Sequence, residues 1–194
     1  MPRIRPCSRT DLAAFDPMFQ ELEEFFGFLP KDYLTMGHKP EVLEAVAELT
    51  RACVFSLGRT PLTLRLLVAY LGSRAAGCMY CTAHCATLAE RAGLAREKIA
   101  HIHDYATHPA FTADERSALR LAAQANQVPN AVDDETFREL RRYFDDEGIA
   151  EIVAVIGMMS FYNRWNDTLA TTLERPSRTF AEANLSWWSG DKHA

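Results

Sequence analysis

The chain of 194 residues has no segment long and apolar enough to cross a bilayer. Its longest predominantly apolar run, residues 152–162, falls well short of the roughly 20 residues that a membrane-spanning helix needs. The first residues are basic but lack the apolar core of a signal peptide. These absences predict a cytoplasmic protein that acts without a membrane partner.

Positive charge is also scarce. Lysine and arginine total 21 against 26 aspartates and glutamates, which gives a net charge of −5, and the basic residues form no cluster. A nucleic-acid-binding surface normally requires a basic patch or stripe. We therefore expect no nucleic-acid partner.

Cysteines are few and unevenly placed. There are five, an odd number, and three of them lie between residues 78 and 85. A framework of structural disulfides would distribute paired cysteines along the chain. The clustering instead predicts redox or metal chemistry at one place.

Strand-like alternation is missing as well, because apolar residues recur at helical spacing almost throughout. The sequence therefore predicts an all-α helical bundle in a single domain of residues 1–194. Thr60-Pro61 is expected to open one helix with Thr60 as its cap, and Arg175-Pro176 is expected to end the last long one. The segment 176–194 carries Trp187-Trp188 and should pack on the body or on a neighbouring subunit.

An internal repeat is suggested when Leu66 is aligned with Glu151. Residues 67–72 then face residues 152–157, and Cys78-Met79-Tyr80-Cys81 falls on Asn163-Arg164-Trp165-Asn166. The alignment predicts two related helical halves, about residues 40–92 and 130–175, around a pseudo-two-fold axis. Chance similarity between amphipathic helices is the alternative.

The most informative stretch is Gly77-Cys78-Met79-Tyr80-Cys81-Thr82-Ala83-His84-Cys85. A helix that begins at Cys78 would point free backbone N–H groups at the first thiol, which favours the thiolate. Because a helix turns about 100° per residue, the three cysteines share one face and His84 lies on the neighbouring edge. His84 can then take a proton from the Cys81 thiol, directly or through a water. This arrangement predicts a redox dithiol with a built-in base.

Two other interpretations of these residues remain open. The thiols can be buried and inert, or Cys78, Cys81, His84 and Cys85 can ligate zinc. Four ligands on one helix cannot surround a metal tetrahedrally, so a zinc site would need an interface with another chain. We therefore expect no metal and no bound organic cofactor.

The chain resembles the carboxymuconolactone decarboxylase and alkyl hydroperoxidase D superfamily. The resemblance covers most of residues 30–175 and rests on the Gly77–His84 motif, residues 36–43, residues 111–116 and residues 163–167. It implies an all-helical fold, an obligate oligomer and a thiol-dependent peroxidase. In such members the second cysteine, here Cys81, attacks the peroxide, and the first, here Cys78, resolves the sulfenic acid into a disulfide. The decarboxylase branch lacks the dithiol.

The chain differs from the hydroperoxidase members at two positions. Those members carry a glutamate twelve residues before the first cysteine, where this chain has Leu66, and a histidine four residues after the second, where it has Cys85. Glu151 is the repeat-related counterpart of the missing glutamate. We expect it either to supply a carboxylate across the pseudo-two-fold or to be an ordinary surface glutamate.

Together these features predict a thiol-dependent peroxidase with an antioxidant role. Cys81 is the expected nucleophile, Cys78 the resolving thiol, and His84 and Glu151 the proton-relay candidates. A catalytic Cys81 should ionise below the value of about 8.5 for a free thiol. The expected partners are a peroxide or hydroperoxide, a dithiol protein or small thiol as reductant, and further copies of the chain. The alternative is a non-catalytic helical oligomer that senses redox state or binds a partner.

Overall fold

The computed structural model describes residues 2–194, and none of these residues lies in a β-strand. The predicted all-α fold is confirmed. In chain order the helices are η1 Thr10–Phe15, α1 Asp16–Phe26, α2 Lys31–Met36, α3 Pro40–Thr50, the π-helical turn η2 Arg51–Phe55, α4 Leu62–Ala75, α5 Met79–Arg91, α6 Arg96–Ala100, η3 Ile102–Asp104, α7 Ala113–Ala125, α8 Asp134–Leu140, α9 Asp146–Leu169, α10 Arg175–Asn184 and η4 Asp191–His193.

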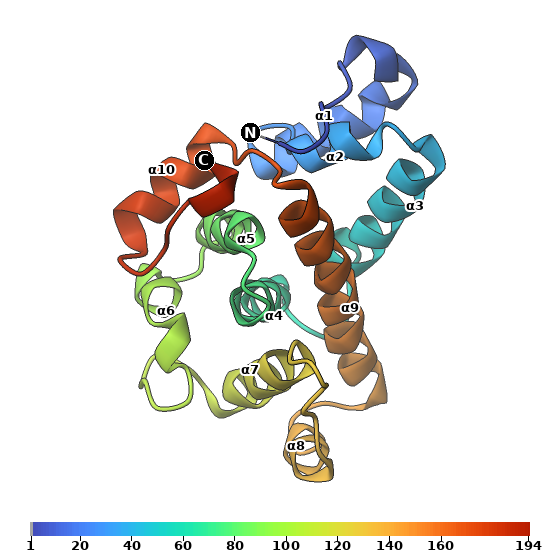
Figure 1. Cartoon of the computed structure of the whole chain (residues 1–194). Helices are drawn as coiled ribbons and strands as arrows, with labels where there is room; N and C mark the ends of the chain where they lie inside the picture. The colour runs from blue at the N-terminus through green and yellow to red at the C-terminus, as the bar shows by residue number, and fades with distance from the viewer. Residues whose placement is uncertain (1) are drawn as a thin grey trace.

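Helices α4 and α5 form the centre of the molecule (Figure 1). Residues 64–73 of α4 and residues 80–89 of α5 are buried without interruption. A helix that is apolar around its whole circumference belongs inside a bundle, and α4 is accordingly packed against α5, α7 and α9. The helix that carries the cysteines is therefore held rigidly in the core.

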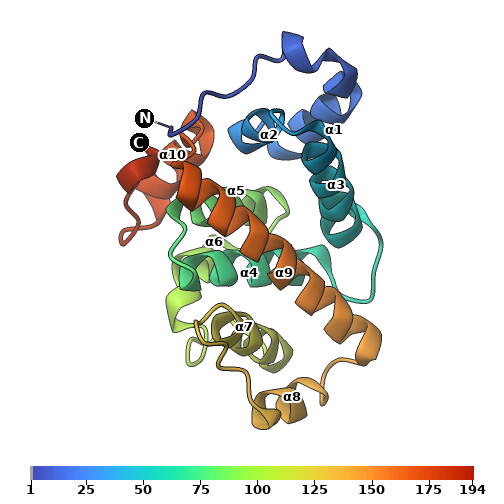
Figure 2. The ribbon, with the colours of Figure 1, turned by 45° about the vertical axis from the view of Figure 1, so that its right-hand side comes forward.

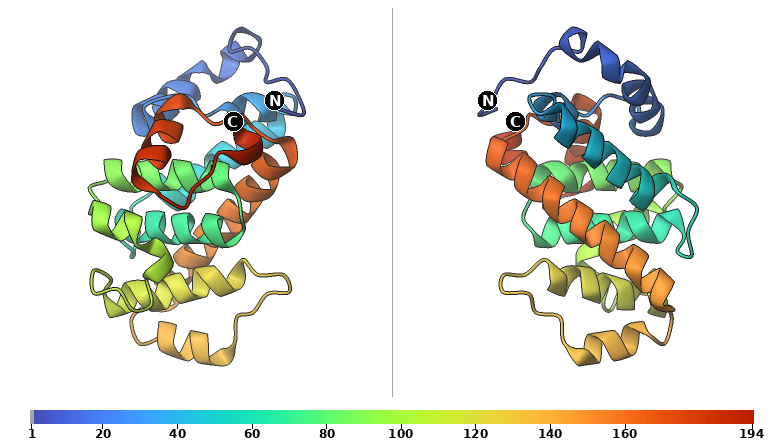
Figure 3. Two further views of the ribbon diagram at one scale, coloured as in Figure 1. Left: turned by 60° about the vertical axis from the view of Figure 1, so that its left-hand side comes forward. Right: turned by 90° about the vertical axis from the view of Figure 1, so that its right-hand side faces the viewer.

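The longest helix, α9, runs diagonally across α4 and α5 (Figure 2). Seen from the sides, the two ends of the chain lie close together at one end of the molecule, and α7 and α8 form the opposite end (Figure 3). No helix among residues 2–194 is long and apolar enough to span a membrane.

The break between α4 and α5 positions the first cysteine. Gly77 adopts a left-handed conformation with φ of 77°, a region that glycine enters without steric cost. A Cβ at this position would meet no atom within 4 Å, so the backbone conformation alone favours glycine. Cys78 then occupies the N-cap of α5. The helix start that the sequence predicted at this point is confirmed.

The end of the chain differs from the prediction. Arg175-Pro176 does not stop a helix but begins α10, because proline is well tolerated in a first turn where its N–H would have no partner. The preceding helix α9 has already ended at Leu169. The expected packing of the tail on the body is confirmed, since the Trp188 indole Nε1 donates to the Met79 carbonyl at 2.9 Å.

Candidate active site

The two motif thiols lie together at the start of α5. Cys78 Sγ accepts a hydrogen bond from the Cys81 backbone N–H at 3.5 Å, and both side chains are buried. The five cysteines are unpaired, so the structure represents the reduced dithiol. Cys78 lies at the N-cap of α5 and Cys81 in its first turn, and the disulfide between them stays a prediction.

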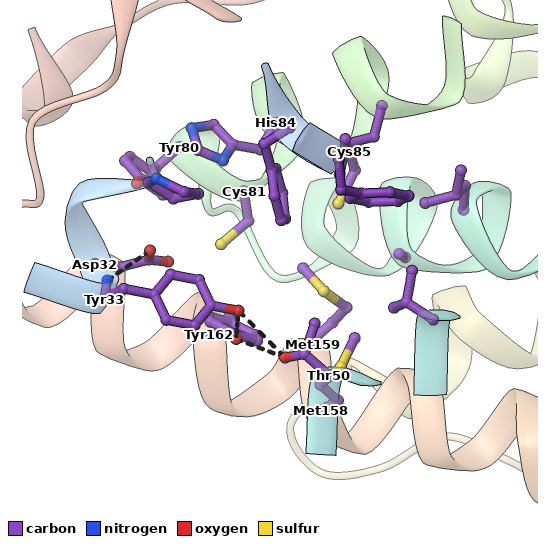
Figure 4. A pocket seen from close by; sticks show the side chains of 17 residues that line it. Asp32, Tyr33, Thr50, Tyr80, Cys81, His84, Cys85, Met158, Met159 and Tyr162 are labelled. Atoms are coloured by element: carbon purple, nitrogen blue, oxygen red, sulfur yellow. Dashed lines mark hydrogen bonds between the residues drawn. The ribbon is translucent and has the colours of Figure 1, made fainter. Parts of the chain in front are cut away.

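Cys81 lines a cavity that is enclosed by α4, α5, α9 and the α1–α3 segment (Figure 4). The cavity contains about 550 Å³ free of protein atoms, part of which is open to solvent. Its lining is mainly apolar and aromatic and comprises Phe25, Phe26, Pro30, Asp32, Tyr33, Thr50, Val54, Leu66, Ala69, Tyr80, Cys81, His84, Cys85, Leu88, Met158, Met159 and Tyr162. Cys78 is not among these residues, so it lies behind Cys81 as seen from the cavity.

His84 borders the same cavity and is paired with a carboxylate. Its Nε2 lies 2.6 Å from Glu174 Oε2, and both side chains are buried. Glu174 Oε1 also accepts from the Tyr80 hydroxyl at 3.1 Å and from the Lys31 N–H at 2.5 Å. Burial alone would raise the pKa of Glu174, but the nearby His84 ring and the hydrogen bonds from His84 and the Lys31 N–H outweigh it and lower the pKa. The site therefore contains an anchored His–Glu pair.

A second carboxylate lies on the opposite side of Cys81. The buried Asp32 accepts from the Tyr33 N–H at 2.9 Å and from Asn166 Nδ2 at 3.0 Å. The same Asn166 Nδ2 lies 3.6 Å from Cys81 Sγ, so one amide connects the thiol to the carboxylate. Burial raises the pKa of Asp32 to about 6, which makes it a proton donor or acceptor near neutral pH.

The lower part of the cavity carries a small hydroxyl network. The Tyr162 hydroxyl lies 2.7 Å from both the Tyr33 hydroxyl and the Thr50 hydroxyl (Figure 4). Thr50 in turn donates to the Val46 carbonyl. These groups satisfy one another, and they leave an otherwise apolar space above them.

The two thiols differ in their acidity. The hydrogen bond from the Cys81 thiol and the contact with His193 lower the pKa of Cys78 to about 6, although burial opposes this. Burial first, and then the negative charge at Cys78, raise the pKa of Cys81. The pair therefore holds its shared proton on Cys81 and its negative charge on Cys78. This is the reverse of the expectation that Cys81 ionises at low pH, because the helix start and His193 both act on Cys78.

His193 reaches the dithiol from the side away from the cavity. One donor atom each of Cys78, Asp167 and His193 lie within 4.8 Å of one another. Such spacing would also suit a metal ion. Here, however, His193 Nδ1 bonds to the Thr171 carbonyl, and the Lys192 ammonium lies 2.9 Å from Asp167. The Lys192 ammonium already supplies a positive charge to Asp167. We therefore describe Cys78, Asp167 and His193 as a hydrogen-bonded network.

The structure brings together three of the four residues that the sequence singled out, Cys78, Cys81 and His84. Glu151 lies elsewhere: its carboxylate accepts from the backbone N–H groups of Arg59 and Thr60 and from the Thr60 hydroxyl. The prediction that Thr60 caps α4 is wrong, because its hydroxyl is used by Glu151 and Pro61 occupies the N-cap. Cys85 lines the cavity as a thiol whose pKa burial raises to about 12.

Sequence reasoning missed Asp32, Glu174, Asn166 and His193. Only Asn166 carried a signal, since the repeat alignment places it opposite Cys81, and the two residues do touch. The others gave none, because nothing local distinguishes a buried carboxylate or imidazole from an exposed one.

Known proteins resemble the chain in sequence and in three-dimensional structure. The sequence profile described as "Carboxymuconolactone decarboxylase family" matches residues 40–124. The uncharacterized protein YnjA of Escherichia coli K12 is 33% identical over 82 residues, which are 42% of this chain and 44% of YnjA. The uncharacterized protein YdfG of Bacillus subtilis 168 is 25% identical over 103 residues, 53% of this chain and 70% of YdfG. The chain thus spans less than half the length of YnjA.

Solved structures extend the likeness to nearly the whole chain. The debrominase Bmp8, solved with 2,3,4-tribromopyrrole, has a TM-score of 0.86 and 32% identity, covering 92% of this chain and 95% of Bmp8. A peroxidase-related protein from Ralstonia eutropha JMP134, described as an alkylhydroperoxidase AhpD core, has a TM-score of 0.74 and 23% identity, covering 91% and 94%. This second likeness concerns the fold. With the cysteine motif at the centre of the matched residues 40–124, the chain belongs to the carboxymuconolactone decarboxylase family, and it shares its fold with the alkylhydroperoxidase AhpD core.

Proposed function

We propose that the protein is a thiol-dependent reductase in which Cys81 reduces a small apolar electrophile, an organic hydroperoxide in the first instance. The observation that carries this proposal is the position of Cys81 Sγ at an apolar cavity with a second thiol, Cys78, directly behind it. Of the two motif thiols, a substrate in the cavity meets only that of Cys81. The other sulfur is placed to form the disulfide.

The oxidation proceeds in two steps. Cys81 transfers its proton to the Cys78 thiolate, and its sulfur attacks the outer peroxide oxygen, which breaks the O–O bond and releases an alkoxide. Cys78 then gives up that proton and attacks the Cys81 sulfenic acid, which forms the disulfide and releases water. In sum, Cys78 thiolate, Cys81 thiol, ROOH and one proton give the disulfide, ROH and water. An external dithiol protein or small thiol reduces the disulfide again.

The additional proton must come from a group at the cavity. The His84–Glu174 pair is suited to this task, because His84 borders the cavity and Glu174 holds its ring in a fixed orientation. Asp32 is the second donor, connected to Cys81 through Asn166. We assign His84 the role of acid–base residue and Glu174 that of a positioning residue. Glu151 has no part in this scheme.

Reductive dehalogenation of a halogenated aromatic compound is the second candidate. It is favoured by the 32% identity to the debrominase Bmp8 over nearly the whole of both chains. Attack of Cys81 on the bromine would give a sulfenyl bromide, and the carbon would take the Cys81 proton. Cys78 would then displace bromide. This reaction also balances, since Cys78 thiolate, Cys81 thiol and ArBr give the disulfide, ArH and bromide.

A single-turnover experiment tests both candidates. The reduced protein is mixed with cumene hydroperoxide or with 2,3,4-tribromopyrrole, and the alcohol, the bromide and the Cys78–Cys81 disulfide are quantified. We expect one equivalent of disulfide per equivalent of product with one of the two substrates. Cys81→Ser should give no product, whereas the matched control Cys7→Ser, at a half-buried cysteine outside the cavity, should behave as the wild type.

The opposite outcome has a clear meaning. If neither substrate oxidises the dithiol faster than it oxidises Cys7, the reductase proposal fails, and the reading as a redox sensor or partner-binding protein takes its place.

A further inference from the structure

The segment after α10 folds back over the start of α5. The Trp188 indole donates to the Met79 carbonyl, and the backbone of residue 173 donates to the His193 carbonyl at 2.9 Å. Arg178 donates to the same carbonyl at 3.0 Å. The His193 side chain is consequently fully buried beside Cys78. A buried imidazole needs partners for both nitrogens, and these partners determine its charge.

Both nitrogens of His193 face acceptors. Nδ1 lies 2.8 Å from the Thr171 carbonyl oxygen, which can only accept, so Nδ1 carries a proton. Nε2 lies 3.2 Å from Asp167 Oδ1, and Cys78 Sγ belongs to the same cluster of atoms within 4.8 Å. A carboxylate and a thiolate both accept hydrogen bonds. The arrangement is satisfied when Nε2 is also protonated, that is, when His193 is an imidazolium.

We propose that His193 is a catalytic residue of the dithiol: an imidazolium that pairs with the Cys78 thiolate and keeps this sulfur ready to attack during disulfide formation and to leave during disulfide reduction. The proposal rests on the redox role of the dithiol proposed above. A thiolate of low basicity is the better leaving group, so a reductant that attacks the cavity-facing Cys81 sulfur would release Cys78 readily.

The charges around His193 are consistent with this assignment. Asp167 on α9 supports the imidazolium, and Lys192 Nζ pairs with the outer oxygen of Asp167 at 2.9 Å. On α5 the Tyr80 ring lies 5.7 Å from the His193 ring, and on α10 Arg178 donates to the His193 backbone carbonyl. Two cations and two anions make the cluster neutral. Burial would lower the pKa of His193, but its hydrogen bonds to Cys78, Thr171 and Asp167 outweigh burial and raise it.

The central helices provide no comparable group for Cys78. The positions where the resemblance implies a glutamate and a histidine hold Leu66 and Cys85, which are apolar or un-ionised. His84 is committed to Glu174 on the cavity side. His193 is therefore the cationic partner that the described residues bring to the Cys78 sulfur.

The first test measures the acidity of Cys78 with the Cys81→Ser variant as background, in which the serine hydroxyl can still donate to Cys78. The rate of alkylation by iodoacetamide is followed against pH with and without His193→Gln. Loss of a cation within about 4–6 Å should raise the apparent pKa of Cys78 by about 1–3 units. The control His103→Gln removes a surface histidine that has a similar 3.2 Å contact, to Asp104, and should leave the profile unchanged.

A second measurement avoids any doubt about folding of the His193 variant. The imidazole of His193 is titrated by NMR in the native sequence and in Cys78→Ser. This substitution removes the negative charge of the Cys78 thiolate and leaves that of Asp167 in place. We expect the His193 pKa to be lower in Cys78→Ser. Equal His193 pKa values in the two proteins, or an unchanged Cys78 profile in His193→Gln, would overturn the proposal. Neither measurement uses a substrate, so failure of the peroxidase or debrominase assay leaves the result intact.

Discussion

At the scale of single residues, the asymmetry between Cys78 and Cys81 has the clearest consequence. Because the negative charge of the pair resides on Cys78, whose pKa is lowered to about 6, the dithiol should lose reactivity when this thiolate is protonated. We expect the rate of disulfide formation to rise with pH through about 6 and to level off above it. Stopped-flow measurement between pH 4.5 and 9 checks this. A rise centred near 8.5 would mean that neither the helix start nor His193 acidifies the pair.

Asp32 yields a prediction about stability. Its folded-state pKa of about 6 lies above the ordinary value of 3.8, so the folded protein binds a proton more tightly than the unfolded chain does. The ionised Asp32 therefore destabilises the fold above pH 6, and this effect disappears below about pH 4. Asp32→Asn should raise the free energy of unfolding at pH 7.5 by about 1–3 kcal/mol while slowing turnover.

Urea unfolding of the wild type and Asp32→Asn at pH 7.5 and pH 4 measures this difference. Asp104→Asn, at an exposed aspartate outside the cavity, is the matched control and should change stability little at either pH. A destabilised Asp32→Asn at pH 7.5 would contradict the prediction.

The candidate site was predictable only where its residues are adjacent in sequence. Cys78, Cys81 and His84 lie on one helix, so their spacing fixes their relation. Glu174, Asp32 and His193 arrive from α10, α2 and the segment beyond α10. Their approach depends on how helices pack, which spacing does not reveal. The same limitation explains Glu151, which the repeat alignment brought near the dithiol and the structure places against the loop before α4.

At the scale of helices, the link between α5 and α10 is the main functional contact. Glu174 occupies the N-cap of α10 and binds His84 of α5. Helix starts that carry strong local signals can be recognised in a sequence: Thr112 and Glu115, three residues apart, form the capping box at the start of α7. Helix α10 was not predicted, because its proline was interpreted as a terminator and its sequence has few apolar residues.

This link predicts a graded series of variants. His84→Gln should slow substrate reduction by about 10²–10⁴, the usual effect of losing an acid–base residue. Glu174→Gln should give a smaller loss, because the ring keeps a neutral hydrogen-bond partner. Glu151→Gln is the control and should react at the wild-type rate. Initial rates at saturating reductant provide the comparison, and a Glu151→Gln defect equal to that of His84→Gln would return Glu151 to the relay.

At the scale of the whole molecule, the prediction of a homo-oligomer is still to be tested. Trp188, one of the two tail tryptophans expected to pack on the body or on a neighbouring subunit, is buried within the chain itself. The end of α3 and the segment after it nevertheless expose apolar side chains, Leu57 completely and Leu49 and Phe55 in part. Exposed apolar side chains of this kind commonly mark subunit contacts.

Multi-angle light scattering tests the assembly at micromolar concentration. We expect a mass that is a multiple of the 21.9 kDa chain. Leu57→Asp should shift the distribution toward smaller species, whereas Val128→Asp, at another exposed apolar residue, serves as the control. A mass of one chain for the wild type would refute the oligomer.

The contact of Trp188 with the first turn of α5 should make its fluorescence sensitive to the dithiol. Its indole is hydrogen-bonded to the carbonyl of Met79, which lies between the two cysteines in the sequence. Thiolates and disulfides quench indole emission at short range and to different extents. The native chain therefore contains its own fluorophore for the redox state of the dithiol, and a single turnover can be followed by emission intensity without any attached dye.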